Sequence, residues 1–295
     1  MFGQYFGNYL VEKNKISQAQ LNIVMEDQHN SSVKLGLIAV AEKLLTTKQA
    51  DDVNELQKKM DKRFGDIAIE KGYLLIEEVN HLLNMQGNPY LKFIQTLTNH
   101  NLLSLNEIEG TLDSFKKDYK LTDSDLDALK SGDIDRIIPI FVDVDIPFIG
   151  ECISLAIRNV VRFINSNLLL KKAYMTKTYS FGSLSCQQMI GDHSIFVGFA
   201  CKDKELLEIA NPFAKEVFTE MDEDSYDSVC EFINCTNGLY ASKLSTENVH
   251  IDMTPPLFYS DKEIASQKDI FVVPIVINGK QIDLLVAMNN KVEIN

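Results

Sequence analysis

The segment DSVCEFINCTNG, residues 227–238, places four polar or small residues along one side of a helix. Asp227, Glu231, Asn234 and Gly238 fall within about 60° of one another at about 100° per residue. A carboxamide such as that of Asn234 can accept one hydrogen bond from a water and donate another. A carboxylate such as that of Glu231 accepts hydrogen bonds and pairs with a cation. The stripe can therefore hold a water and a positive group, although the solvated face of a surface helix is the alternative.

The helix that holds this stripe must bury its other side. Val229, Phe232, Ile233, Leu239 and Tyr240 occupy that side, and we expect them to pack on a sheet. The expected strands cover 168–182, 186–201, 250–260, 270–279 and 280–290.

Other elements complete this half of the chain. Asn278-Gly279 is a strong two-residue hairpin signal between the last two strands. A long amphipathic helix is expected over 148–165, and a helical segment over 204–218 precedes the stripe. The order predicts an α+β domain with an antiparallel sheet and long helices.

The stripe and its surroundings resemble the CheC/CheX/FliY family of chemotaxis phosphatases over about residues 137–295. The family motif is Asp or Ser, three residues, Glu, two residues, Asn, about 22 intervening residues and then a proline. Asp227, Glu231 and Asn234 match it, and Pro256, which we expect in a strand, comes one residue short of the usual gap.

The resemblance implies a phosphatase that acts on the aspartyl phosphate of a CheY-type response regulator in chemotaxis or related two-component signalling. The regulator itself brings the phosphoryl group, a bound Mg²⁺ and a lysine, so the phosphatase needs no cofactor of its own. Asn234 would orient the attacking water and Glu231 would pair with the regulator's lysine. Asp227, Gly238 and Pro256 would support them: Asp227 is also close enough to the helix start to interact with the dipole, and Gly238 would let another backbone approach.

Two further expectations follow from the same resemblance. In the first long helix Glu151 is followed by Ser154 where the motif has asparagine, so a single site of the CheX-like kind is expected. CheX-like proteins dimerise by joining sheets, and the long apolar terminal strands here would allow a homodimer.

The first half of the chain contains four copies of a 24-residue unit separated by five residues. Each copy is expected to form two short helices with a turn between them, near Asn14 or Gly72. Ser17, Thr46 and Ser104 are expected to cap the second helices. One unit is too small to bury its apolar face, so the copies must pack on one another. The copies are 5–28, 34–57, 63–86 and 92–115.

This repeat resembles MshEN, the N-terminal domain of type II secretion and type IV pilus ATPases. That unit reads RLGxxLVxxGxIxxxxLxxxLxxQ, and the family binds cyclic di-GMP. The third copy keeps most of the pattern, whereas the first has Tyr5 in place of the arginine, the second has Lys43 at the second glycine and the fourth has Ile94 at the first. A nucleotide site would therefore be built from the second and third copies, with its glycines admitting close approach. Its candidate residues are Lys34, Gly36, Gln57, Arg63, Gly65, Gly72 and Gln86.

Two hypotheses for the whole chain remain open. The first is a regulator phosphatase controlled or localised by the repeats. The second is a non-catalytic adaptor or sensor, in which the repeats bind cyclic di-GMP or a partner protein, or dimerise, while the second half docks a regulator. The expected domains are an all-α repeat domain over 1–116, a linker helix within 117–138 and a CheX-like domain over 139–295.

The amino-acid composition indicates which kinds of partner the protein can bind and in which cellular compartment it is expected. The 42 acidic and 29 basic side chains give a formal charge of −13, which disfavours binding to a nucleic acid polymer or an anionic membrane surface. The N-terminus lacks a signal-peptide pattern and no apolar run is long enough to span a membrane, so we expect a cytoplasmic protein. The five histidines show no paired spacing for a metal. The five cysteines, which show no CxxC spacing, are expected to be buried apolar residues in a reducing compartment.

Overall fold

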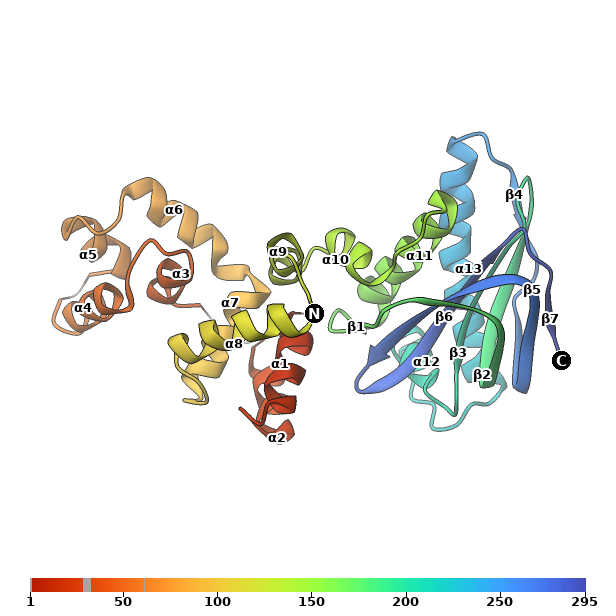
Figure 1. The fold of residues 1–295 in the computed structure, drawn as a ribbon, viewed down its shortest axis with the longest axis horizontal. Helices are drawn as coiled ribbons and strands as arrows, with labels where there is room; N and C mark the ends of the chain where they lie inside the picture. Colours follow the sequence, from red (N-terminus) through yellow and green to blue (C-terminus); the bar gives the residue numbers. More distant parts are fainter. Residues whose placement is uncertain (1, 29–32, 61) are drawn as a thin grey trace. The chain divides into compact units, whose positions relative to one another are not determined.

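The computed structural model describes residues 2–28, 33–60 and 62–295. The chain divides into two compact units, Phe2–Asp133 and Ile134–Asn295, which are described separately (Figure 1). Of the spacers between the repeat copies, residues 29–32 and 61 lie outside the described residues. The division falls inside the segment expected as a linker, because α9 belongs to the first unit and α10 to the second.

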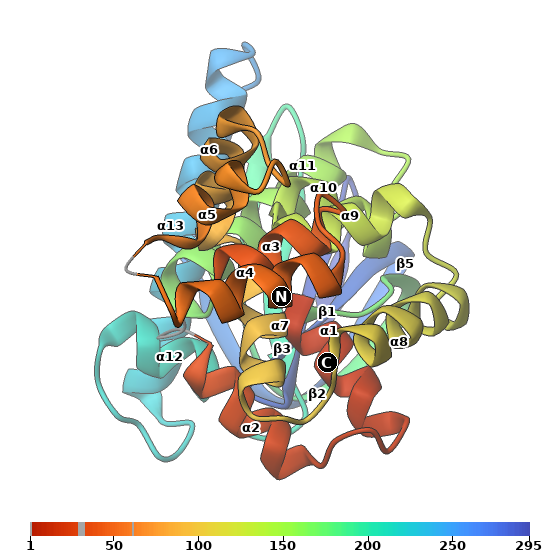
Figure 2. The ribbon, with the colours of Figure 1, turned by 90° about the vertical axis from the view of Figure 1, so that its left-hand side faces the viewer.

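The described elements of the first unit are all helices, and each of the four repeat copies forms one helical pair (Figure 2). Ser17, Thr46 and Ser104 each cap the second helix of their copy through a capping box, which confirms their predicted role. The elements are α1 Phe2–Glu12, α2 Gln18–Asp27, α3 Leu35–Ala41, α4 Thr47–Gln57, α5 Phe64–Glu70, α6 Ile76–Asn84, η1 Met85–Gly87, α7 Pro89–Asn99, α8 Leu105–Asp118 and α9 Asp123–Ser131.

The turn inside each helical pair uses a left-handed residue at the same repeat position. Asn14, Lys43, Gly72 and Asn101 have φ values of 54°, 59°, 67° and 52°. Glycine and asparagine adopt this conformation at a low cost in free energy, whereas for a lysine the cost is higher. Nothing lies within 4 Å of the place where a Cβ of Gly72 would be. The turn, and not a close approach by other atoms, therefore explains this glycine.

Replacing Lys43 with glycine should stabilise the first unit. The left-handed backbone of a non-glycine residue costs about 1–2 kcal/mol, and the entropy of glycine returns about 0.5–1 kcal/mol of that. We expect Lys43→Gly to raise the free energy of unfolding by about 0.5–1 kcal/mol, measured by urea denaturation with far-UV circular dichroism. Lys117→Gly is the control. It removes the same charge from a helical position of α8 and should lower the free energy of unfolding. Loss of stability in both variants would contradict this explanation of the turn.

The repeat copies pack two by two, the second with the third and the first with the fourth. In the central pair, a Cβ on Gly36 would lie 2.9 Å from the Phe64 ring, and one on Gly65 would lie 3.6 Å from Leu35. The closing glutamines of these two copies also bond across the pair. Gln86 Nε2 donates to Val33 O at 2.9 Å and Gln57 Nε2 to Lys62 O at 3.4 Å, so each binds the residue before the other copy.

The second unit contains an antiparallel sheet and five helical segments. Its helices are α10 Ile134–Phe141, α11 Pro147–Asn159, the π-helical η2 Val160–Ile164, α12 Leu207–Ala214 and α13 Glu223–Thr246. Its strands are β1 Leu169–Leu170, β2 Tyr174–Gly191, β3 Ile195–Cys201, β4 Ile251–Met253, β5 Leu257–Ile277, β6 Lys280–Met288 and β7 Val292–Ile294.

Several strand expectations are wrong. The expected strands 168–182 and 186–201 are each interrupted, at 171–173 between β1 and β2 and at 192–194 between β2 and β3, and β5 runs through the gap expected between 260 and 270. The break expected between residues 182 and 186 does not exist, because β2 runs through it. There Gly182 meets the backbone of another segment: its Cβ would lie 2.1 Å from Lys202 O. The expected strand 250–260 is interrupted, because Pro255 and Pro256, which lack N–H donors, lie between β4 and β5.

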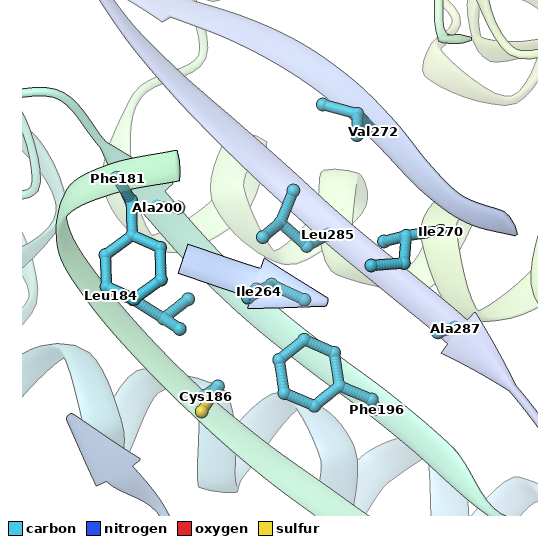
Figure 3. Packing of buried hydrophobic residues seen from close by; sticks show 10 residues of the cluster. All are labelled: Phe181, Leu184, Cys186, Phe196, Ala200, Ile264, Ile270, Val272, Leu285 and Ala287. Carbon is cyan, nitrogen blue, oxygen red and sulfur yellow. The ribbon is translucent and has the colours of Figure 1, made fainter. Parts of the chain in front are cut away.

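Long strands close the sheet on itself around an apolar core. β2 pairs with β3, β3 with β6 and β6 with β5, and β5 also pairs with β2. Figure 3 shows the side chains from these four strands that point into the enclosed space. They are Phe181, Leu184, Cys186, Phe196, Ala200, Ile264, Ile270, Val272, Leu285 and Ala287.

The opposite face of the sheet holds α13. Phe232 of α13 packs between Phe199 of β3 and Phe213 of α12, with ring centroids 5.7 and 5.4 Å away. Asn159 at the end of α11 donates to Thr236 Oγ1 of α13 at 3.1 Å in a buried contact. Buried rings and this hydrogen bond therefore set the position of α13.

Candidate functional site

All four stripe residues lie in α13. Asp227 and Glu231 are exposed, and Asn234 and Gly238 are half-buried. Asp222 caps the helix and accepts a hydrogen bond from Ser225 N, which holds the pKa of the Asp222 carboxyl below its usual value. The acidic residues of the first turn are Glu223 and Asp224, so Asp227 lies beyond the positions where the dipole acts most strongly.

One buried side chain from the sheet holds Asn234. Gln187 of β2 is 2% exposed, and its Nε2 donates to Asn234 Oδ1 at 2.8 Å. Within the described part of the chain no group accepts a hydrogen bond from Asn234 Nδ2. The amide group of Asn234 is thereby left available, together with the second lone pair of its oxygen.

Gln187 makes two further contacts that the sequence did not reveal. Its Nε2 also donates to Thr254 O at 2.8 Å, and its Oε1 accepts from Asn237 Nδ2 at 2.9 Å. The available signal was the polar pair Gln187-Gln188 in a strand otherwise expected to be buried, because a buried carboxamide needs partners. Its partners lie 47 to 67 residues away in sequence, so spacing alone could not identify them.

Glu231 projects from α13 next to an exposed cysteine. Cys235 Sγ lies 3.9 Å from Glu231 Oε1. Partial burial and this carboxylate raise the pKa of the Cys235 thiol. Cys152, Cys186, Cys201 and Cys230 are buried as expected, whereas the expectation is wrong for Cys235. The described residues hold no group of three or more His, Cys, Asp or Glu that could bind a metal, and His29 lies outside them.

Gly238 lies beside the end of β4, and Pro256 lies in the connection that follows it. A Cβ on Gly238 would lie 3.6 Å from Met253 Cε, an ordinary contact, so within this chain it is a side chain and not a backbone that approaches this glycine. Pro256 is half-buried between β4 and β5, two residues after the Thr254 carbonyl that Gln187 holds. The end of β4 thus borders Gly238, and the connection that follows it is tied to Asn234.

Exposed apolar side chains border the stripe. Met253 is 40% exposed beside Gly238, and Phe258 is 45% exposed and stacks on Tyr226, with ring centroids 4.6 Å apart. Leu257, which lies between them in sequence, is 53% exposed. Leu239 was expected on the buried side of the helix but is 50% exposed. Exposed apolar residues gathered around polar groups are typical of protein-binding surfaces.

The carboxylate of Glu151 in α11, the first long helix, is paired within the chain. Glu151 of α11 forms an ion pair with Lys243 of α13, with Nζ and Oε2 2.5 Å apart. This carboxylate is held by the neighbouring helix, unlike that of Glu231.

A cavity of about 1160 Å³ lies between the second and third repeat copies. Six of the seven residues expected at a nucleotide site line it, and Gly72 does not. The lining repeats itself, because residues at the same position of both copies face the cavity. These pairs, each 29 residues apart, are Lys34 and Arg63, Leu35 and Phe64, Gly36 and Gly65, Asp51 and Asn80, Asn54 and Leu83, and Gln57 and Gln86.

The first and fourth copies place buried apolar groups at the same repeat positions. Phe6 and Phe93 correspond to Leu35 and Phe64, and both are fully buried. Where the central copies close with glutamine, the fourth has Phe115, whose ring centroid lies 5.7 Å from that of Phe6. An aromatic ring therefore replaces one of the two closing glutamines in this pair, while the first copy keeps the other as Gln28.

Comparison with known proteins identifies a domain in the second unit. Residues 183–277 match the family model described as chemotaxis phosphatase CheX. The matched segment extends from within β2 to the end of β5 and contains every predicted catalytic or supporting residue of the stripe region. No curated protein matches the chain. No helix of the described residues is long and apolar enough to cross a membrane.

Solved structures similar to part of the chain include a CheC-like superfamily protein from Shewanella sp. PV-4, 20% identical, with a TM-score of 0.44 over 49% of this chain and 99% of that one. The chemotaxis protein CheX from Desulfovibrio desulfuricans is 10% identical, with a TM-score of 0.43 over 48% and 99%. A CheX–CheY–BeF3–Mg²⁺ complex from Borrelia burgdorferi is 19% identical, with a TM-score of 0.35 over 48% and 98%.

Proposed function

We propose that the second unit is a phosphatase for the aspartyl phosphate of a CheY-type response regulator. The observation that supports this most is that Glu231 and Asn234 stand on one accessible side of α13 inside the segment that matches the chemotaxis phosphatase CheX model. The exposed apolar residues next to the stripe give a partner protein a surface to cover.

Asn234 is the group we assign to the attacking water. Its Oδ1 keeps one lone pair after accepting from Gln187 Nε2, and its Nδ2 is available to donate. A water that donates to this oxygen can lie in line with the phosphorus, while Nδ2 reaches a phosphoryl oxygen. The side chain changes no protonation state, so its contribution is orientation.

Glu231 is assigned to the regulator's lysine. The exposed carboxylate can form a charge-assisted hydrogen bond with an ammonium group and so fix the register of docking. Asp227 adds negative charge one turn earlier on the helix. Gly238 has no side chain, so the next turn leaves room for the partner protein to approach. Pro256 limits the conformations of the connection beside the stripe. The regulator supplies the Mg²⁺ and the phosphoryl group.

Release of inorganic phosphate tests this function. A CheY-type regulator is kept phosphorylated with acetyl phosphate, and the full chain is added at substoichiometric concentration. We expect phosphate release to rise in proportion to the chain, with many turnovers per molecule. The experiment is repeated with several CheY-type regulators. If phosphate is released no faster than from the regulator alone in every case, the proposal is contradicted.

For the first unit, the cavity favours a cyclic dinucleotide as ligand. A ligand made of two equal halves suits a lining made of two equal sets of residues, and Lys34 and Arg63 offer a cation to each half. Gln57 and Gln86 add amide groups at matching places. Cyclic di-GMP is therefore our candidate, and a protein-docking role of the repeats, as in an adaptor, is the alternative.

Arg63→Ala should weaken the binding of cyclic di-GMP by the full chain about tenfold or more, because a guanidinium contact to phosphate or base is lost. Isothermal titration calorimetry measures the affinity. Lys92→Ala is the matched control, since Lys92 has the same repeat position in the fourth copy and lies outside the cavity. Absence of heat with the unmodified chain at tens of micromolar nucleotide would remove the dinucleotide and leave the docking role.

A further inference from the structure

Gln187 is a buried amide that connects three separate segments. It lies in β2 opposite Val197 of β3, and its side chain reaches α13 and the connection between β4 and β5. Both hydrogens of its Nε2 are used, one by Asn234 Oδ1 and the other by Thr254 O, and its Oε1 accepts from Asn237. A side chain fixed at three points has little freedom to rotate.

The backbone of Thr254 decides which way this amide points. A carbonyl oxygen only accepts hydrogen bonds, so the group of Gln187 that faces Thr254 O must be the Nε2 donor. Thr254 is itself held, because its N–H donates to Gln188 O at 3.0 Å and its Oγ1 to the same oxygen at 2.9 Å. The proline that follows restricts the Thr254 backbone to extended conformations.

The orientation of Asn234 follows from that of Gln187. Because Nε2 is a donor, Asn234 must turn its oxygen toward Gln187 and its amide nitrogen away from it. Asn237, one turn further along α13 and fully buried, donates to Gln187 Oε1 from the other side. With Thr254 O fixed as an acceptor, only this arrangement pairs a donor with an acceptor at all three contacts of Gln187, although Asn237 Oδ1 is buried without a partner among the described residues.

We propose that Gln187 is the positioning residue of the phosphatase site, which fixes the rotamer of Asn234 and the end of its amide that meets the phosphoryl group. This inference rests on the proposed function of Asn234. Gln187 touches neither water nor regulator; it acts through Asn234. Gln187 thus connects Asn234 to the segment between β4 and β5. Met253 and Leu257, two of the exposed apolar residues that border the stripe and are called the rim below, flank this segment.

Gln187→Met keeps the length of the side chain and removes its polar group. We expect the maximal rate of phosphoryl decay to fall about 10- to 100-fold, because Asn234 loses its fixed geometry. The concentration of chain that gives half this rate should stay within about twofold, since Glu231 and the rim are unchanged. Gln188→Met is the matched control: it removes the neighbouring glutamine, which bonds Ser194 Oγ at 2.7 Å, and should leave the rate unchanged.

Gln187→Glu tests the direction of the amide. In its ionised form the new carboxylate offers only acceptors, so Thr254 O loses its donor and Asn234 should turn its NH₂ group inward, with a loss of activity of similar size. Side-chain amide exchange observed by NMR reports this turn. In the unmodified chain the Asn237 NH₂ group should exchange slowly and that of Asn234 quickly, and in Gln187→Glu the Asn234 group should become protected. If Gln187→Met does not fold, this variant provides both the rate and the exchange measurement.

The outcomes separate this inference from the proposed function. Full activity of both Gln187 variants, in a chain where Asn234→Ala is inactive, would overturn the positioning role alone. An equal loss in Gln188→Met, or a shift in the half-saturating concentration with the maximal rate unchanged, would overturn it as well. Unchanged decay with Asn234→Ala would instead refute the proposed function.

Discussion

Asn234→Ala should return the decay of a phosphorylated regulator to the rate of the regulator alone, a loss of at least about 100-fold in the accelerated rate. The substitution removes the only group on the stripe that both donates and accepts hydrogen bonds. The stability cost should be small, about 1–3 kcal/mol, because one donor of Gln187 is left without a partner. Phosphoryl decay and thermal denaturation, measured on the same preparation, separate the two effects.

Asn234→Asp gives a stricter control for the fold. Its carboxylate can still accept from Gln187 Nε2, so the contact with the sheet is retained. It loses the NH₂ group and places a negative charge beside the phosphoryl group, so this variant should also be inactive. An active Asn234→Asp would show that the amide nitrogen does not take part.

Glu231→Lys should reduce kcat/KM for the regulator about 100-fold. Two like charges would face each other where an ion pair is proposed, and a cost of about 3 kcal/mol corresponds to that factor. The reduction should appear as weaker docking, with the geometry around Asn234 preserved. Titration with a beryllofluoride-activated regulator measures the docking step directly.

Glu247→Lys is the matched charge reversal on the same helix. Glu247 is the C-cap of α13, about 24 Å from Glu231 at 1.5 Å per residue, and a cation there is favourable to the helix dipole. It should bind the regulator like the unmodified chain. Equal weakening in both variants would mean that net charge, and not a pair at Glu231, governs docking.

The helical pairs of the first unit were largely predictable because their signals are local. Capping residues, a left-handed turn and helical spacing all lie within one copy, and Ser17, Thr46 and Ser104 cap as expected. The pairing of copies was harder, since it depends on which faces meet. In the structure, Ile94 and Phe115 account for the pairing. They are buried apolar residues of the fourth copy, and the corresponding residues of the second and third copies line the cavity.

The sheet was predicted in kind but not in its strand limits. A break was expected between residues 182 and 186, whereas Gly182 serves the close approach of Lys202 within a continuous strand. Two prolines were placed inside a strand that they in fact interrupt. For Gly182 a distant segment, absent from any local pattern, decides what the residue does, whereas the prolines interrupt the strand because they lack N–H donors.

The stripe itself was visible in the sequence, but its support was not. The spacing of Asp227, Glu231 and Asn234 follows from helix geometry alone. Gln187 meets Asn234 only because β2 and α13 pack together, so no spacing rule connects them. Leu239 and Cys235 were expected to be buried and are exposed, because the helix is long and covers the sheet along only part of its surface.

A single-turnover decay experiment shows whether Asn234 directs the water that attacks the phosphoryl group. A regulator is phosphorylated with ³²P, freed of phosphodonor and mixed with Mg²⁺ and an excess of the full chain or of its Asn234→Ala variant. We expect fast loss of label from the regulator with the unmodified chain and loss at the regulator's intrinsic rate with the variant. Decay at one common rate in both mixtures, for a regulator that binds the chain, would contradict it.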